Sequence, residues 1–301
     1  MREEIILKFD AEVSLKGYIW KNENVVQIGT VQIAHGLSEH VSRYDHFANY
    51  LADNGFIVIA ADHYGHGESA KSPDKVGQIK DYDFIDAVIK SIKLVREEHD
   101  ELFKGIKCLF GHSMGSIASQ EYIQRFPNDY DKVILSGTDV GSFKYVLLKL
   151  LTKLTIKEND YITTSKILNN FTFRAFEKKF KDKSPFNWLS KNIDNVNNYI
   201  NDPLCGAPVP DKAFRSLAIS LRKSFKNKNV KLINPSIKIL IFSGSKDPVS
   251  AFGKSVNRLY KKYRKYNIDV YKKLYSDLRH ETLNEKEFQI VYDDILNFIK
   301  N

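Results

Sequence analysis

The chain has 301 residues, which is long enough for one large domain or two of ordinary size. Hydrophobic residues make up 43% and charged residues 28%, which excludes a disordered, collagen-like or coiled-coil chain. The net charge of +9 would suit an anionic partner, but no dense basic block stands out, so we interpret the surplus as solvated lysines scattered over the surface. No nucleic-acid-binding module is recognised, and we expect no nucleic-acid partner.

The sequence also bears on the compartment. Only Cys108 and Cys205 occur, so there is no disulfide framework and a reducing environment is expected. The first ten residues, MREEIILKFD, contain acidic residues and no long apolar core, unlike a secretory signal. The most apolar helical stretch, residues 145–156, is too short to span a bilayer. We therefore expect a cytoplasmic protein.

Short β-branched runs alternate with amphipathic helical patterns over the first part of the chain, up to about residue 141. In chain order, the predicted strands are 12–20, 30–36, 56–62, 106–111 and 132–137, and the predicted helices are 44–54, 82–99 and 114–126. Continuous apolar strands separated by helices indicate a mostly parallel sheet with helices on both faces.

The alternation stops at residues 142–234. This segment holds one of the 15 glycines and four of the eight prolines, and its pattern predicts several short helices and no strand. Alternation then resumes with a strand at 237–244, a helix at 250–266, a strand at 268–275 and a last helix from about residue 285. We therefore predict an α/β core formed by residues 1–141 and 235–301, with a helical cap inserted at 142–234.

The strongest chemical motif is the G-x-S-x-G at residues 111–115 (GHSMG), which follows a predicted strand and opens a predicted helix. In a nucleophile elbow the serine occupies a strained strand-to-helix turn, and the glycines on either side let neighbouring backbone pass close by. The bare pentapeptide also occurs by chance in turns. The strand before it and the helix after it favour Ser113 as a nucleophile.

A serine hydroxyl needs a base and an orienting carboxylate, which follow it in the order Ser, Asp, His in this arrangement. Of the eight histidines, only His280 follows Ser113, and it lies in a predicted loop after the last strand. Asp247 follows the preceding strand and is the favoured acid, with Asp139 as the alternative. Asp277 shares the loop of His280, which is a poor geometry for orienting the imidazole.

The oxyanion of the tetrahedral intermediate needs preorganised hydrogen-bond donors. One expected donor is the backbone amide of Met114, which follows the nucleophile. The other is the amide of Leu37, in the loop after the strand that ends at residues 35–36.

The sequence resembles the monoacylglycerol lipase and lysophospholipase group of α/β-hydrolases, whose relatives include serine aminopeptidase-like hydrolases. The resemblance covers nearly the whole chain outside the cap and rests on HGLSEHVSRY (35–44), DHYGHGES (62–69), GHSMGS (111–116), GSKDPV (244–249) and RHETLNE (279–285). Within the cap, only FNWLS (186–190) and NDPLCG (201–206) are similar.

The resemblance implies an α/β-hydrolase fold with a lid, and a serine esterase that cleaves monoacylglycerols or lysophospholipids through an acyl-enzyme without a metal or organic cofactor. It implies Ser113 as nucleophile, His280 as base, Asp247 as acid, and Leu37 and Met114 as oxyanion donors. Two other functions stay open: an esterase, amidase or peptidase acting on short substrates, and a non-catalytic small-molecule receptor on a hydrolase scaffold.

The resemblance also bears on polar residues around the site. It implies that Glu39 and Arg43 contact the polar head of a glycerol ester, although the same pair could form a buried salt bridge that holds the oxyanion loop. A second loop is expected to be scaffold, and it contains Asp62, His63, Gly65, His66 and Gly67.

The first cap helix has an apolar stripe at roughly helical spacing, with two lysines, Lys149 and Lys153, on another face. The stripe contains Val146, Leu147, Leu150, Leu151 and Leu154. Such a stripe can make transient contact with a membrane surface, or it can be the inner face of an ordinary cap helix. Both interpretations stay open at this point.

Overall fold

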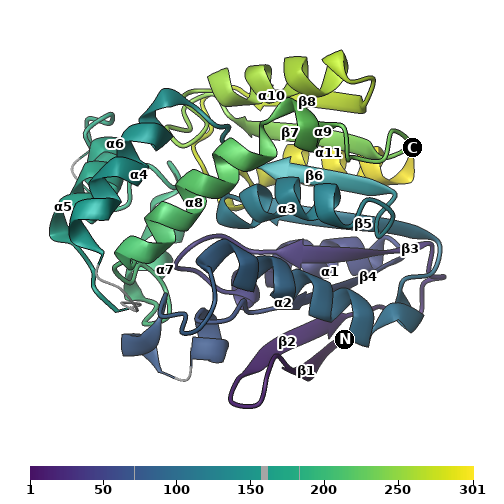
Figure 1. Ribbon diagram of the computed structural model, residues 1–301. Helices are drawn as coiled ribbons and strands as arrows, with labels where there is room; N and C mark the ends of the chain where they lie inside the picture. The colour runs from purple at the N-terminus through teal and green to yellow at the C-terminus, as the bar shows by residue number, and fades with distance from the viewer. Residues whose placement is uncertain (71, 157–161, 183) are drawn as a thin grey trace.

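The computed structural model describes residues 1–70, 72–156, 162–182 and 184–301. One eight-stranded sheet with the order β1-β2-β4-β3-β5-β6-β7-β8 runs through the molecule (Figure 1). Its strands are β1 (Arg2–Lys8), β2 (Ser14–Trp20), β3 (Gly29–Ala34), β4 (Phe56–Ala61), β5 (Ile106–His112), β6 (Lys132–Ser136), β7 (Lys238–Gly244) and β8 (Asp269–Tyr275). Strand β2 is antiparallel to both of its neighbours, and the other pairs are parallel.

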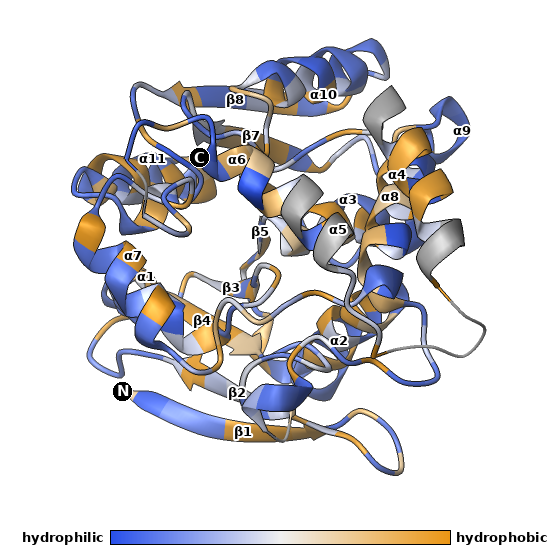
Figure 2. Ribbon diagram, turned by 90° about the vertical axis from the view of Figure 1, so that its left-hand side faces the viewer, coloured by the Kyte–Doolittle hydropathy of each residue, from blue (hydrophilic) through white to orange (hydrophobic). Residues whose placement is uncertain are grey.

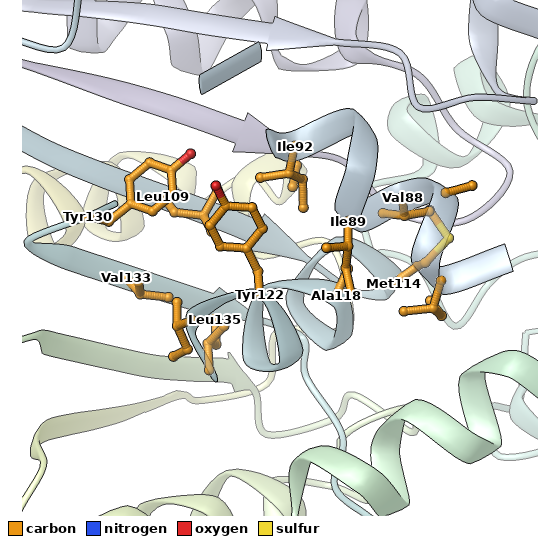
Figure 3. Packing of buried hydrophobic residues seen from close by; sticks show 14 of the residues in the cluster. Val88, Ile89, Ile92, Leu109, Met114, Ala118, Tyr122, Tyr130, Val133 and Leu135 are labelled. Carbon is orange, nitrogen blue, oxygen red and sulfur yellow. The ribbon is translucent and has the colours of Figure 1, made fainter. Parts of the chain in front are cut away.

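Helices cover both faces of this sheet, as the continuous apolar strands predicted. One face is covered by α2 (Phe84–Glu98), α3 (Met114–Arg125) and α10 (Lys254–Lys265), and the other by α1 (Asp45–Asp53) and α11 (Phe288–Lys300). Figure 3 shows the first layer from close by, where side chains of α2 and α3 meet those of β5 and β6. The predicted fold class, an α/β-hydrolase with a mostly parallel sheet, is confirmed.

Strand β1 was not among the strands predicted from the sequence. Only Ile5 and Leu7 of this strand are buried, whereas Ile6 between them is 69% exposed. Because β1 lies at the edge of the sheet, it lacks the continuous apolar run of the inner strands, and its short alternation was not recognised as a strand.

The described residues between β6 and β7 form helices and no strand. These helices are α4 (Phe143–Thr155), α5 (Lys166–Asn169), α6 (Ala175–Glu177), α7 (Ile193–Asn201), α8 (Asp211–Ser224) and α9 (Asn227–Val230). Most of them gather on the left of Figure 1, beyond the carboxyl ends of the parallel strands. A division of the chain into core and cap at residues 142 and 234 stays a prediction. No helix among the described residues has both the length and the apolar character needed to cross a bilayer.

Candidate active site

Ser113 lies in the tight turn between β5 and α3. Its backbone has φ 51° and ψ −115°, a left-handed conformation that costs a non-glycine residue free energy and is common at functional sites. The Ser113 amide donates to the Ser136 carbonyl oxygen at 2.9 Å, which ties the turn to β6. A side chain on Gly115 would collide with the Ala34 carbonyl oxygen, so this position of the motif requires glycine. The turn is a nucleophile elbow in geometry as well as in sequence.

His280 and Asp247 meet at the same edge of the sheet, in the loops after β8 and β7. The His280 Nδ1 atom lies 3.0 Å from Asp247 Oδ1, and both side chains are buried. Burial alone lowers the pKa of His280, but the charge of Asp247 and its hydrogen bond outweigh this effect and raise that pKa above its ordinary value. Donation from Nδ1 leaves Nε2 free to accept a proton.

The structure brings Asp247, and not Asp139, to the imidazole. Asp139 instead accepts hydrogen bonds from the Val140 amide at 2.7 Å and from the hydroxyls of Ser255 and Tyr145. Asp277 is exposed and lies 3.9 Å from the ammonium of Lys246. Neither rival carboxylate forms a hydrogen bond with His280 among the described residues.

The loop that contains Leu37 packs directly against the nucleophile. A Cβ atom on Gly36 would lie 3.3 Å from the Ser113 Cβ and 2.5 Å from Glu39 Oε1, so a larger residue would have to push these side chains aside. The Gly36 amide donates to Glu39 Oε1 at 2.5 Å, which holds the loop in its turn. Among the described residues, the backbone amides of Leu37 and Met114 donate no hydrogen bond to another segment of the chain. Both residues line the same cavity as Ser113.

Arg43 forms a buried ion network with two glutamates. Its Nη1 atom lies 2.6 Å from Glu39, and its two terminal nitrogens lie 2.8 and 2.7 Å from the two carboxylate oxygens of Glu281. Asn195 of α7 hydrogen-bonds to both Arg43 and Glu281. Burial alone would raise the pKa of Glu281, but the charge of Arg43 lowers it to about 2. This geometry matches the buried salt bridge that the sequence left open.

Glu281 was missed by the sequence analysis. Its carboxylate lies next to the base in the chain and also lines the cavity, as Glu39 does. The residue lies within the RHETLNE motif, which was interpreted only for His280, and its ion pair is with Arg43, 238 positions away. The one available signal was its place directly after the predicted base His280.

The loop with Asp62 behaves as the scaffold that was expected. The Asp62 carboxylate accepts hydrogen bonds from the backbone amides of Val41 and Glu68, both at 2.8 Å. It thereby joins this loop to the segment that follows the loop of Leu37. The backbone amide of His63 donates to His35 at 2.9 Å. Burial lowers the pKa of His63 to about 3, so its imidazole stays neutral at ordinary pH.

A cavity of about 470 Å³ lies between the core and the cap helices. Ser113, His280, Leu37 and Met114 form part of its wall, and most of the remaining wall is apolar. The apolar part includes Tyr145, Leu148, Phe173, Trp188, Phe214 and Leu221. A nucleophile, a paired base and two backbone donors in the wall of a largely apolar cavity can support acyl transfer from an ester with a hydrocarbon chain.

Comparisons with known proteins agree with this geometry. Residues 27–287 match the family described as serine aminopeptidase, S33. A monoacylglycerol lipase from Mycolicibacterium smegmatis is 28% identical over 275 residues, which is 90% of this chain and 88% of that protein. A monoglyceride lipase homolog from Monkeypox virus is 24% identical over 85% of this chain and 83% of its own length.

Solved structures show the same fold. A thermostable carboxyl esterase from Bacillus coagulans superposes with a TM-score of 0.84 at 24% identity, covering 99% of this chain and 98% of its own. The monoacylglycerol lipase from Paleococcus ferrophilus superposes with a TM-score of 0.69 at 22% identity, covering 95% of this chain and 98% of its own. The resemblance noted in the sequence is therefore confirmed: the chain belongs to the serine aminopeptidase, S33, family and is a hydrolase of the α/β-hydrolase fold.

Proposed function

We propose that this hydrolase cleaves monoacylglycerols, the carboxylic esters of glycerol with one fatty acid. The observation that carries the proposal is the largely apolar cavity of about 470 Å³ whose wall includes Ser113 and His280. A short ester would leave most of this apolar wall in contact with water, whereas a fatty chain would bury it. The similarity to proteins named monoacylglycerol lipase supports the same substrate class.

The proposed reaction runs through an acyl-enzyme. The Ser113 hydroxyl attacks the ester carbonyl while His280 Nε2 takes its proton, and the amides of Leu37 and Met114 stabilise the oxyanion. His280 then gives this proton to the departing glycerol oxygen. Water, deprotonated by the same histidine, attacks the acyl carbon and releases the fatty acid and free Ser113. Asp247 holds the imidazole in the required tautomer throughout.

The charges around the cavity favour a neutral head group over a phosphate. Among the described residues, the carboxylate and guanidinium side chains in its wall are those of Glu39, Glu177, Glu281 and Arg174. Arg43 does not line the cavity, because Glu39, Glu281 and Asn195 occupy its guanidinium. An anionic lysophospholipid head would therefore meet a wall with more negative than positive charge, whereas glycerol hydroxyls can hydrogen-bond to carboxylates.

We also propose that helix α4 touches the lipid surface that supplies the substrate. Leu147 and Leu150 of the predicted stripe are 45% and 52% exposed, whereas Leu148, which lies outside that stripe, is buried and lines the cavity. The helix thus has apolar side chains on its outer face as well as on its inner one. The side chains of Lys153 and Leu154 lie outside the described part of the structure.

Hydrolysis of emulsified monoacylglycerol by purified protein tests the proposal. Replacing Ser113 with alanine should abolish fatty-acid release, whereas Ser236→Ala, an exposed serine, should leave it unchanged. A series of p-nitrophenyl esters from acetate to palmitate should be cleaved faster as the chain lengthens. A steep preference for acetate would contradict the lipid substrate, and full activity of Ser113→Ala would contradict the mechanism.

A further inference from the structure

Two short stretches, 222–231 and 254–265, carry a net positive charge larger than that of the whole chain. Together they contain eleven lysines and arginines and no acidic residue, which is more charge than the whole chain's net +9. The rest of the chain is therefore slightly acidic. The surplus is therefore not evenly scattered, and the two stretches, separated in sequence, come together in the fold.

Side-chain contacts join the two stretches into one surface. The Lys262 ammonium on α10 hydrogen-bonds to Asn227 at the start of α9, and it lies 4.8 Å from the ring centre of Phe225. Arg258 lies 5.6 Å from the same ring. We call this surface the basic face; it consists of Arg222, Lys223, Lys226, Lys228, Lys231, Lys254, Arg258, Lys261, Lys262, Arg264 and Lys265. All of them are exposed except Lys262, which is half-buried.

The basic face has almost no acidic neighbours. Within the described part of the chain, only Lys223 has an ion-pair partner, the carboxylate of Glu121. Burial lowers the pKa of Lys262, and the neighbouring charge of Lys265 lowers it further. Helix α10 packs on the core through apolar residues such as Val256 and Leu259, so its cations other than Arg258 and Lys262 are not needed for packing. The cations of such a face repel one another, and together they attract an extended anion.

The basic face adjoins the outer side of the cap. The Arg258 guanidinium donates to the Gly141 carbonyl oxygen at 3.3 Å, immediately before α4 begins. In Figure 2, α9 and α10 are largely hydrophilic and α4 is largely hydrophobic. Leu147 and Leu150 on α4 are exposed, and so is Leu232, which follows the last cation of α9 and is 55% exposed.

We propose that the basic face is a docking surface for an anionic phospholipid membrane, which orients the cap and its cavity toward the bilayer. The membrane's role as the source of substrate rests on the function proposed above. Cations next to exposed leucines match a bilayer, whose phosphates and acyl chains lie close together, whereas a nucleic-acid backbone gains nothing from leucines. Each lysine or arginine near an anionic surface strengthens binding by roughly fivefold, so a few cations are enough for measurable attachment.

Vesicle cosedimentation of the full chain tests this proposal. We expect the protein to sediment with phosphatidylcholine vesicles that contain phosphatidylglycerol, to bind vesicles of phosphatidylcholine alone at least about tenfold more weakly, and to be released by high salt. Equal binding to both kinds of vesicle, or no binding to either, would overturn the proposal. Stronger retention on duplex DNA than on anionic vesicles would also overturn it and identify a nucleic-acid partner.

Charge-reversal variants locate the surface. One variant reverses three exposed positions of α10 and is Lys261→Glu, Arg264→Glu, Lys265→Glu. A control makes the same charge change at exposed sites elsewhere and is Lys8→Glu, Lys104→Glu, Lys286→Glu. The α10 variant should lose vesicle binding by at least about tenfold more than the control. Equal losses would mean that only net charge matters and would refute a defined docking face.

Activity assays separate this proposal from the proposed function. Both charge variants should hydrolyse a soluble p-nitrophenyl ester at the wild-type rate, because none of the changed residues lies in the cavity. The α10 variant alone should be slower on monoacylglycerol carried in anionic vesicles. Ser113→Ala should bind vesicles like the wild type. An α10 variant that binds and hydrolyses vesicle-borne substrate like the control would contradict docking, whatever the outcome for Ser113.

Discussion

The protein places charge in two contrasting ways, in the buried network around Arg43 and on the basic face. Arg43 is 9% exposed and has three partners, two of them carboxylates. On α10, by contrast, Arg264 is exposed and has no carboxylate partner among the described residues. The first arrangement fixes the relative positions of two loops of the candidate active site, since Glu39 accepts a hydrogen bond from the Gly36 amide and Glu281 directly follows His280. The second leaves charge available to a partner outside the molecule.

Whether a charge is buried and paired or exposed and unpaired determines which property its substitution should change. Removing one member of a buried ion network leaves the others unpaired away from water, which is costly for stability. Removing an exposed, unpaired charge costs little stability and changes mainly what the surface attracts. Buried substitutions should therefore affect catalysis and folding strongly, whereas those on the basic face should affect mainly binding and change stability by little.

The largest effect is expected at the buried pair of Asp247 and His280. Asparagine at position 247 keeps the size of the side chain but favours the wrong imidazole tautomer, so kcat on a soluble ester should fall by about 10⁴-fold. Asp277→Asn is the matched control, since Asp277 is exposed and its left-handed backbone, φ 59°, suits asparagine. Similar losses in both variants would argue against a specific role for Asp247.

The next effect concerns stability. Arg43→Met should lower the free energy of unfolding by about 3–5 kcal/mol, because Glu39 and Glu281 stay buried without their cation. Arg264→Met on the basic face should change it by less than about 0.5 kcal/mol. Urea unfolding followed by circular dichroism measures both. An Arg43 variant as stable as the Arg264 variant would mean that the network contributes nothing to folding.

A smaller effect is expected in the pH profile. His280 must be neutral to accept the serine proton, so kcat/KM falls as the pH drops through its pKa. The charged groups facing its ring are Asp247, Glu39 and Glu281, and the nearby His112 is kept neutral because burial lowers its pKa to about 4. Each carboxylate raises the pKa of His280 against the effect of burial.

Removing one of these negative charges should therefore lower the pKa of His280. We expect Glu281→Gln to move the acid limb of kcat/KM to lower pH, while the exposed control Glu287→Gln leaves it in place. A melting curve of each variant at the assay pH shows whether the fold is intact. An unshifted or upward-shifted limb in a folded Glu281→Gln protein would contradict the electrostatic role of this carboxylate.

The same contrast explains what the sequence could predict. Strands β2 to β8 are recognisable from local patterns, and Ser113, Asp247 and His280 from a motif, the order of residues and their positions after strands. Glu281 and the basic face were not recognised, because each depends on segments that only the fold brings together. Glu281 needs Arg43 from near the other end of the chain, and α10 needs the turn around Asn227. Taken alone, each cationic stretch resembles an ordinary solvated helix face.

The smallest expected effect is a change in stability at Lys261 on the basic face. Lys261 has cations three residues before it and four residues after it on α10, at Arg258 and Lys265, so neighbouring turns of the helix repel each other. Lys261→Gln keeps a good helix former and removes this repulsion, which should raise the free energy of unfolding by about 0.2–0.5 kcal/mol at low salt and by less at high salt. Binding to anionic vesicles should fall in the same variant. Higher stability together with weaker vesicle binding would show that Lys261 serves the membrane at a cost to the helix. Lower stability with unchanged binding would show instead that Lys261 stabilises the helix and does not contact a membrane.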